Sequence, residues 1–315
     1  MAYNFKEVVN KKSRLVSGHR MCAGCAAPVI VRNALRALND EDNAVVSCAT
    51  GCLEVSTCIF PYTSWDNVSF IHTAFECASA CLNGAEKTYE KLKRDGKIKK
   101  ETKFIGFGGD GGTYDIGLQS LSGAMEREAN IAYFCYDNGA YMNTGNQRSS
   151  STPHFSDTTT SPAGKKIPGK MQSRKDLTQI MVSHNIPYVA QTALFGNLKD
   201  LYEKSGKAIY TDGPSFVNAL SPCPRGWGYN KEDLQLISKL AIDTCFWPIY
   251  EVINGKYKIN YKPAKKLPIE EFLRPQKRFR HMFLAGNEWM IEEFQKSVDE
   301  KWNYLLMMEE ITNKE

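Results

Sequence analysis

The stretch FIGFGGDGGTYDIG, residues 104–117, decides the fold of this chain. It carries an apolar, strand-like run into a cluster of glycines and then opens a helix-like segment. Glycines at such a turn let the backbone approach a phosphate closely, and the free amides of a helix N-terminus favour an anion. Gly-Asp-Gly also occurs in many ordinary turns, so the meaning of this stretch depends on its surroundings.

Strand-like and helix-like segments alternate around that stretch, from about residue 15 to residue 235. Alternation at this length predicts crossover connections and a mostly parallel sheet flanked by helices, an α/β fold. The predicted strands are NAVVSCAT (43–50), VSFIHT (68–73), KFIGFGG (103–109), NIAYFCYDN (130–138), IPYVAQTAL (186–194) and PSFVNALSP (214–222), and the predicted helices cover 27–40, 75–95, 114–129, 173–185 and 197–212.

Two segments interrupt the alternation. Residues 139–175 are rich in Gly, Ser, Thr, Asn and Pro, and a loop this long is typically functional or disordered; we favour a functional loop. From residue 247 the chain shows a hairpin signal at Asn254–Gly255 and then a helical segment, residues 287–310. We therefore predict an α/β domain over residues 1–246 and a C-terminal extension over 247–315 that serves packing or assembly.

Composition narrows the class of protein. The 315 residues include 42% hydrophobic and 24% charged residues, and the net charge of +5 is too small to indicate nucleic-acid binding. The chain shows no signal peptide and no apolar run near the ~20 residues that a membrane span needs. Ten cysteines in such a chain indicate a reducing, cytoplasmic location, in which thiols serve as metal ligands or small core residues.

Asp110 and Asn138 follow two successive predicted strands, 28 positions apart. If these strands are parallel neighbours, both side chains emerge at the carboxyl edge of the sheet, where doubly wound sheets bind ligands. A carboxylate, an amide oxygen, a backbone carbonyl and phosphate oxygens are the hard ligands that Mg²⁺ prefers. The spacing therefore predicts a magnesium–diphosphate site; a tight turn with a helix cap is the simpler alternative.

At these motifs the chain resembles a known family. GDGGTYDIG followed by DNGAYMNTGNQ is similar to the thiamine diphosphate motif of the β subunits of 2-oxoacid:ferredoxin oxidoreductases, above all the pyruvate type. The resemblance covers nearly the whole chain, since CAGCAAP, ATGCLEV, HTAFECASACLNGAE, SPCPRGW and RFRHM also have counterparts in order. It implies the thiamine-diphosphate-binding fold and the cofactors thiamine diphosphate and Mg²⁺.

The resemblance assigns roles to individual residues. It implies that Asp110, Asn138 and the Ala140 carbonyl bind Mg²⁺, and that Asn143 faces the reacting carbon as a catalytic residue. One departure is Gly139, where members of the family usually have an acidic residue or another larger side chain. The cofactor-binding residues that it implies are Thr50, Gly51, Cys52, Phe75, Gly109, Asp110, Gly111, Gly112, Asn138, Ala140, Met142 and Asn143.

The C-x-x-C of Cys22 and Cys25 is compatible with three kinds of site: zinc, a redox disulfide or an iron–sulfur cluster. Zinc would need further close ligands, often a second C-x-x-C, and none appears; local spacing does not choose between the other two. Cys52 and Cys223 each follow a predicted strand at the carboxyl edge, and a cysteine followed by proline is typical of ferredoxin ligands. The family resemblance implies the same four cysteines, which predicts a 4Fe-4S cluster.

The remaining cysteines are interpreted as small buried core residues. A ligand swap from Cys52 to the nearby Cys48 or Cys58 is the alternative. Among the histidines, His19 is a candidate to line the site, and His72 lies beside the HTAFE motif that the family places near the cofactor; His154, His184 and His281 are interpreted as structural.

The predicted function is that of one subunit of a thiamine-diphosphate-dependent 2-oxoacid:ferredoxin oxidoreductase (EC 1.2.7 type). The resemblance implies oxidative decarboxylation of a pyruvate-type substrate, ferredoxin as the electron acceptor, and a hetero-oligomer whose partner subunit binds the pyrimidine end of the cofactor. Two alternatives stay open: a subunit of an oxalate oxidoreductase, and an iron–sulfur subunit that only transfers electrons.

Overall fold

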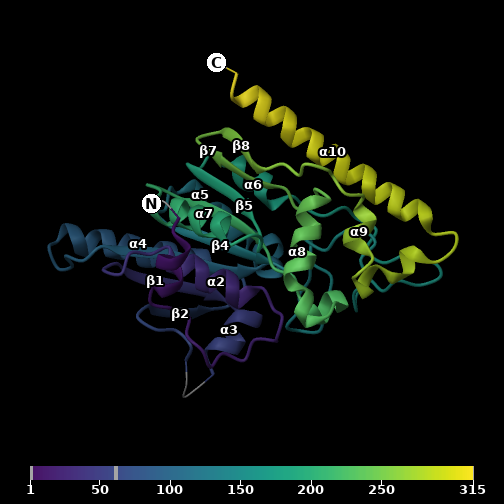
Figure 1. Cartoon of the computed structure of the whole chain (residues 1–315). Coiled ribbons are helices and arrows are strands. Elements are labelled where there is room, and N and C mark those ends of the chain that lie inside the picture. The colour runs from purple at the N-terminus through teal and green to yellow at the C-terminus, as the bar shows by residue number, and fades with distance from the viewer. Residues whose placement is uncertain (1–2, 60–62, 315) are drawn as a thin grey trace.

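One mixed sheet organises the molecule (Figure 1). The computed structural model describes residues 3–59 and 63–314. The strands lie in the order β2-β1-β3-β4-β6-β5-β7-β8. Their bounds are β1 (Asn43–Ala49), β2 (Ser69–Thr73), β3 (Thr102–Gly109), β4 (Ala132–Asp137), β5 (Tyr188–Thr192), β6 (Ser215–Leu220), β7 (Ile249–Ile253) and β8 (Lys256–Tyr261).

Every pairing from β2 to β5 is parallel, whereas β7 and β8 pair antiparallel at one edge. The six predicted strands and their parallel arrangement are thus confirmed, and so is the hairpin at Asn254–Gly255, which joins β7 to β8. The central strands β4 and β6 are buried along their whole length, as expected for strands covered on both faces.

The five predicted helices are confirmed as α2, α4, α5, α6 and α7, with slightly shorter bounds. The helices are α1 (Phe5–Asn10), α2 (Ala27–Arg36), α3 (Cys52–Thr57), α4 (Ala78–Arg94), α5 (Leu118–Glu126), α6 (Leu177–Val182), α7 (Lys199–Tyr210), α8 (Leu234–Asp243), α9 (Ile269–Leu273) and α10 (Glu288–Thr312). Four short turns complete the list: the π-helical turns η1 (Gly111–Asp115) and η2 (Pro224–Gly228), and the 3₁₀ turns η3 (Lys231–Asp233) and η4 (Lys277–Phe283).

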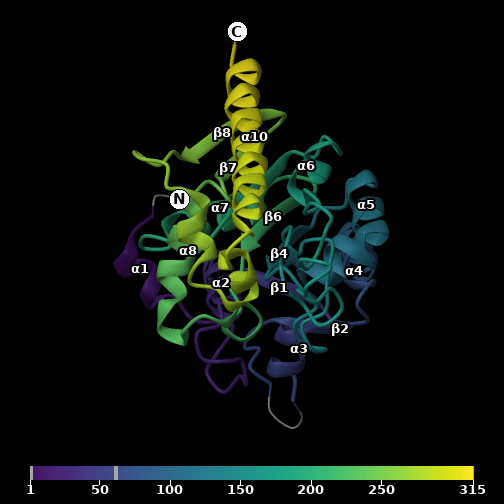
Figure 2. The ribbon, with the colours of Figure 1, turned by 90° about the vertical axis from the view of Figure 1, so that its right-hand side faces the viewer.

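Helices cover both faces of the sheet (Figure 2). On one face α2 and α7 pack against the strands, and on the other α4, α5 and α6 do so. Pairs such as Ile30 with Val217 and Leu82 with Tyr133 belong to these two cores. Burial of such side chains contributes about 1.5–3 kcal/mol each, which holds the strand ends in fixed positions.

A third core joins the C-terminal segment to the loop after β4. Trp227 and Trp247 lie at its centre, together with Phe272 and Phe294 of α9 and α10. Helix α10 runs along the edge of the molecule and continues past β8 towards the C-terminus (Figure 1). The boundary predicted at residue 247 stays a prediction, and the hairpin that follows it extends the main sheet.

Candidate functional site

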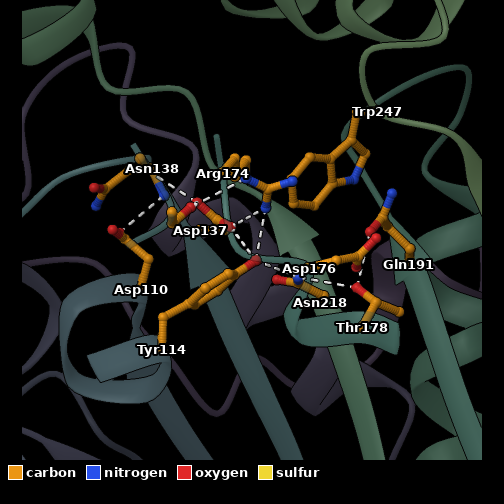
Figure 3. Close-up of polar contacts among 12 residues, drawn as sticks. Asp110, Tyr114, Asp137, Asn138, Arg174, Asp176, Thr178, Gln191, Asn218 and Trp247 are labelled. Atoms are coloured by element: carbon orange, nitrogen blue, oxygen red, sulfur yellow. Dashed lines mark hydrogen bonds and ion pairs between the residues drawn. The ribbon is translucent and has the colours of Figure 1, made fainter. Parts of the chain in front are cut away.

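The carboxyl ends of β3 and β4 form the centre of the site (Figure 3). The two strands are parallel neighbours, with Gly109 opposite Tyr136 at their ends. Asp110 follows β3 and Asn138 follows β4, so both side chains emerge at the same edge, as the sequence predicts. The Asn138 backbone N–H donates to Asp110 Oδ1 over 3.3 Å.

Three polar groups converge at this edge. One amide atom of Asn138 lies 2.9 Å from Asp110 Oδ1 and 2.7 Å from the Ala140 carbonyl oxygen. If that atom is the amide nitrogen, it donates to both oxygens; if it is Oδ1, three acceptor oxygens meet and need a cation between them. Adjacent ligands of an octahedral Mg²⁺ lie about 2.8–3.0 Å apart, given Mg–O distances of about 2.0–2.1 Å. The spacing and the donor types of the three groups therefore fit Mg²⁺.

Asp110 is 1% exposed, and Ser149 donates to its Oδ2 over 2.5 Å. Burial raises the pKa of Asp110 well above its usual range, and the nearby Asp137 carboxylate raises it further. A buried carboxylate in that position stays ionised most readily when a cation pairs with it. Ser149, which sequence reasoning missed, fixes the carboxylate from the loop side.

A cleft opens beside Asp110, Asn138 and the Ala140 carbonyl, which together are called the oxygen set below. The structure places along it all twelve residues that the sequence assigns to the cofactor, although their roles towards a cofactor stay a prediction. Its walls are Thr50, Gly51, Cys52, Phe75, Gly109, Asp110, Gly111, Gly112, Tyr136, Asn138, Ala140, Tyr141, Met142, Asn143 and Thr144. The cleft encloses only about 30 Å³, whereas pockets that surround a small molecule enclose about 300–1,000 Å³. The described residues therefore do not by themselves enclose a small molecule at this cleft.

The glycine run shapes the cleft by letting aromatic rings approach the backbone. A Cβ atom on Gly111 would lie 2.3 Å from the ring of Tyr141, which is far inside van der Waals contact. The Tyr141 hydroxyl donates to the Gly111 carbonyl over 3.0 Å, and its ring packs edge-on against Phe75. Gly111 is thus required for the shape of the cleft.

The four predicted cluster cysteines come together from three places in the fold. Cys22 and Cys25 lie before α2, Cys52 begins α3, and Cys223 follows β6. Burial raises the pKa of Cys25 to about 12, and the Cys223, Cys52 and Cys22 thiols each raise it further. The Gly226 N–H donates to Cys223 Sγ over 3.4 Å, the kind of contact that stabilises a metal-bound thiolate.

The other cysteines differ in how far they are buried. Cys48 is buried in β1, and burial, followed by the influence of Cys58 and Glu54, raises its pKa. Cys135 and Cys245 are also buried, in agreement with the prediction that they are core residues. Cys81 is exposed on α4, so its assignment to the core was wrong; helical spacing alone did not show which face of α4 it occupies.

His19 and His72 are not among the described residues that line the cleft. His19 contacts Arg32 of α2 at 3.4 Å, and His72 contacts Glu54 of α3 at 3.3 Å. Over residues 3–59 and 63–314, no three His, Cys, Asp or Glu side chains form a group that could hold a single metal ion. A four-iron cluster holds its sulfur ligands farther apart than one ion does, so the cluster assignment remains a prediction.

A buried polar network behind the oxygen set escaped the sequence analysis (Figure 3). Asp137, which precedes Asn138, accepts from the Tyr114 hydroxyl at 2.6 Å and from the Arg174 guanidinium. Its other oxygen accepts from the Gly139 N–H at 3.0 Å and from Ser151 at 2.5 Å. These bonds fix the turn that presents Asn138 and Ala140, so the network acts as the support of the oxygen set.

The network continues away from the cleft through Asn218, whose amide donates to Tyr114 at 2.7 Å and to Thr178 at 3.1 Å. The Arg174 guanidinium also lies over the Trp247 ring, 4.5 Å from its centroid. Because these partners come from β6, α6 and the start of the C-terminal extension, the network ties the long loop of residues 139–175 to the sheet. Part of that loop is therefore structural.

Comparisons with known proteins identify the family. A model of the thiamine pyrophosphate enzyme C-terminal TPP binding domain matches residues 49–219. The chain is 48% identical to pyruvate synthase subunit PorB of Thermotoga maritima, over 99% of this chain and 98% of that protein. It is 50% identical to pyruvate synthase subunit PorB of Methanocaldococcus jannaschii, over 91% of this chain and 95% of that protein. The chain belongs to the β subunits of the 2-oxoacid:ferredoxin oxidoreductases.

Two further similarities bear on this β subunit. It is 40% identical to ketoisovalerate oxidoreductase subunit VorB of Pyrococcus abyssi, over 94% of this chain and 93% of that protein. A solved 2-oxoglutarate:ferredoxin oxidoreductase from Magnetococcus marinus shares its fold, with a TM-score of 0.52, 22% identity and coverage of 70% of this chain and 68% of that one. No helix in the described part of the chain is both long and apolar enough to span a membrane.

Proposed function

We propose that this β subunit holds the diphosphate end of thiamine diphosphate through Mg²⁺ and carries a 4Fe-4S cluster beside it. The observation that supports this most directly is the convergence of Asp110, Asn138 and the Ala140 carbonyl at the carboxyl edge of β3 and β4. The glycine-lined cleft next to them contains Cys52, one of the four clustered cysteines, so the two proposed cofactors share a wall.

The chain's own groups have separate tasks in this proposal. Asp110, Asn138 and Ala140 would hold Mg²⁺, and the backbone of residues 109–112 would follow the diphosphate. Asn143, exposed at the cleft, would donate a hydrogen bond towards the reacting carbon. Bound thiamine diphosphate supplies a carbanion that attacks a carbonyl and an electron sink for loss of CO₂. The four cysteines would hold the cluster, which would supply one-electron transfer towards ferredoxin.

The substrate we propose is a 2-oxoacid of the pyruvate type. The two relatives reported above with the higher identity are named pyruvate synthase subunits, and the third is named for ketoisovalerate, a branched 2-oxoacid. The oxalate alternative has no counterpart among these three names. A subunit that only transfers electrons would need neither ligands for Mg²⁺ nor a thiamine pyrophosphate binding domain. This chain has the oxygen set and matches the model of such a domain.

The proposal includes a partner subunit that completes the site. The small cleft leaves the rest of thiamine diphosphate uncovered, so a second protein surface would close over the pyrimidine end. The exposed side chains Trp289, Tyr304 and Met307 of α10 make the C-terminal extension a candidate to grip that subunit in a hetero-oligomer. The cytoplasmic location indicated by the cysteine content belongs to the same proposal.

Cofactor content in variants of the co-purified complex tests the proposal. Asp110→Ala, with Asp110→Asn as an isosteric second variant, is expected to lose thiamine diphosphate and to keep iron, because removing one hard oxygen ligand weakens an octahedral Mg²⁺ site. Full thiamine diphosphate occupancy in both variants would refute the magnesium assignment.

The cluster assignment is tested in the same complex. Cys52→Ser is expected to lower the iron content and the thermal stability, because a cluster clamps distant segments together. Cys135→Ser and Cys48→Ser serve as controls and are expected to keep full iron. If Cys48→Ser removes the cluster while Cys52→Ser retains it, the ligand list is wrong.

A further inference from the structure

Arg278, the first residue of the RFRHM motif, is a buried cation to which no role has been assigned. It lies in η4 and is 5% exposed. Its Nε donates to Gln276 Oε1 over 2.9 Å, and its guanidinium lies over the Trp227 ring, 3.9 Å from the centroid. These contacts orient the flat group but bring no negative charge to it.

In the described part of the chain, Arg278 has fewer polar partners than the other buried cations near the site. Arg174 pairs with Asp137, and Lys170 donates to three backbone carbonyls. Within the described ranges, Arg278 forms no ion pair and its Nη2 has no hydrogen-bond partner. Burial lowers the pKa of Arg278 to about 9, so the group stays charged at neutral pH. An unpaired buried charge is costly, and its retention indicates that an anion acts on it.

The surroundings of Arg278 place it beside the turn that begins after Cys223. Trp227, on which it stacks, belongs to η2, the turn that follows Cys223 and whose Gly226 N–H donates to Cys223 Sγ. The acidic groups that act on Arg278 are Asp137, Cys223 and Asp110. Asp137 is already paired with Arg174, and Asp110 belongs to the proposed Mg²⁺ set. Cys223, with whatever it ligates, is the remaining acidic group.

We infer that Arg278 is a positioning residue for electron transfer: its fixed positive charge stabilises the reduced form of the cluster held by Cys223 and raises the cluster's reduction potential. This inference rests on the proposed function, because it requires the cluster. A cluster with four thiolate ligands is anionic, and reduction adds one more negative charge, so a nearby cation favours the reduced state. The inferred effect is electrostatic and needs no direct contact with the cluster.

Gly139 offers a substitution that changes the charge of this region with a matched control. A Cβ atom at Gly139 would lie 3.2 Å from Arg278 Nη1, so a side chain placed there meets the guanidinium directly. Gly139 has φ +74°, a conformation that Asp and Asn tolerate better than other side chains. Gly139→Asp places a carboxylate against Arg278 and neutralises it, whereas Gly139→Asn has the same size and no charge.

The experiment is a redox titration of the cluster, followed by electron paramagnetic resonance, in the assembled complex of wild type and both variants. In Gly139→Asp the ratio of reduced to oxidised cluster at fixed potential is expected to fall about tenfold relative to Gly139→Asn, which is about 59 mV for a one-electron couple. Iron content is measured in parallel and is expected to be equal in both variants.

Arg278 is tested in the same assay. Arg278→Gln is expected to shift the potential in the same direction as Gly139→Asp. Arg278→Lys is expected to keep most of the wild-type potential, because Lys keeps the charge.

Equal potentials in Gly139→Asp and Gly139→Asn, with iron present, overturn this inference and leave the proposed function standing. A wild-type complex without iron overturns both. A shift confined to thiamine diphosphate affinity would place the charge on the cofactor side and also overturn the inference.

Discussion

Replacing Arg174 by Gln is expected to destabilise the chain strongly, because it leaves Asp137 as a buried carboxylate without its cation. Asp137 is 2% exposed. Removing one partner of a buried ion pair typically costs about 3–5 kcal/mol. Asp137 would keep hydrogen bonds from Tyr114, Ser151 and the Gly139 N–H, and these bonds solvate the charge. We therefore expect a loss near the lower limit, about 3 kcal/mol in the free energy of unfolding.

The assay is urea unfolding of the purified chain without cofactors, followed by tryptophan fluorescence and extrapolated to zero denaturant. A double-mutant cycle isolates the pair. Asp137→Asn combined with Arg174→Gln removes both charges, and we expect it to recover at least about 1 kcal/mol relative to the sum of the single variants. Arg174→Lys is expected to fall between wild type and Arg174→Gln, since Lys lacks the planar fork that reaches Asp137, Tyr114 and Ser151 together.

Lys301→Met is the matched control for this prediction. Lys301 pairs with Asp176 at 2.8 Å, but their side chains are 34% and 26% exposed, and a pair of that kind contributes about 0–1 kcal/mol. If Arg174→Gln costs no more than Lys301→Met, or if the cycle shows no coupling between Arg174 and Asp137, the network does not support the turn that carries Asn138.

Two further predictions concern the cleft. Asn143→Ala in the complex is expected to keep thiamine diphosphate and iron while turnover falls about 10²–10³-fold, the usual effect of losing a donor to a developing oxyanion; steady-state rates with pyruvate check this, and unchanged turnover places Asn143 outside the reacting centre. Gly111→Ala is expected to lower the free energy of unfolding by about 1–3 kcal/mol, because the added methyl group collides with the Tyr141 ring. Gly84→Ala on α4, where a Cβ atom meets nothing within 4 Å, is expected to be neutral or stabilising by up to about 1 kcal/mol; an equal loss in both variants would contradict the packing argument.

The fold, and the meeting of Asp110 and Asn138 at one edge of the sheet, could be predicted from the sequence because both depend on short-range signals. Each strand of the parallel core is a compact apolar or β-branched run, and each crossover helix has its own periodicity, so their alternation predicted the sheet. Asp110 and Asn138 each follow directly at a strand end, and parallel strands bring such ends together. The family motifs supplied the remaining cleft residues, all of which the structure places along one wall.

What surrounds the site was decided only by the tertiary structure. Arg174 reaches Asp137 across 37 positions, and the Trp227 indole reaches the Asn138 carbonyl across 89. Arg174 lies in an irregular loop, where no period in the sequence indicates which side chain turns inward. The face of α4 that carries Cys81, and the lack of a partner for Arg278 Nη2 within the described residues, depend likewise on packing between distant segments. Such contacts form only when each loop and helix has packed against the sheet, and that packing requires the whole chain to be folded.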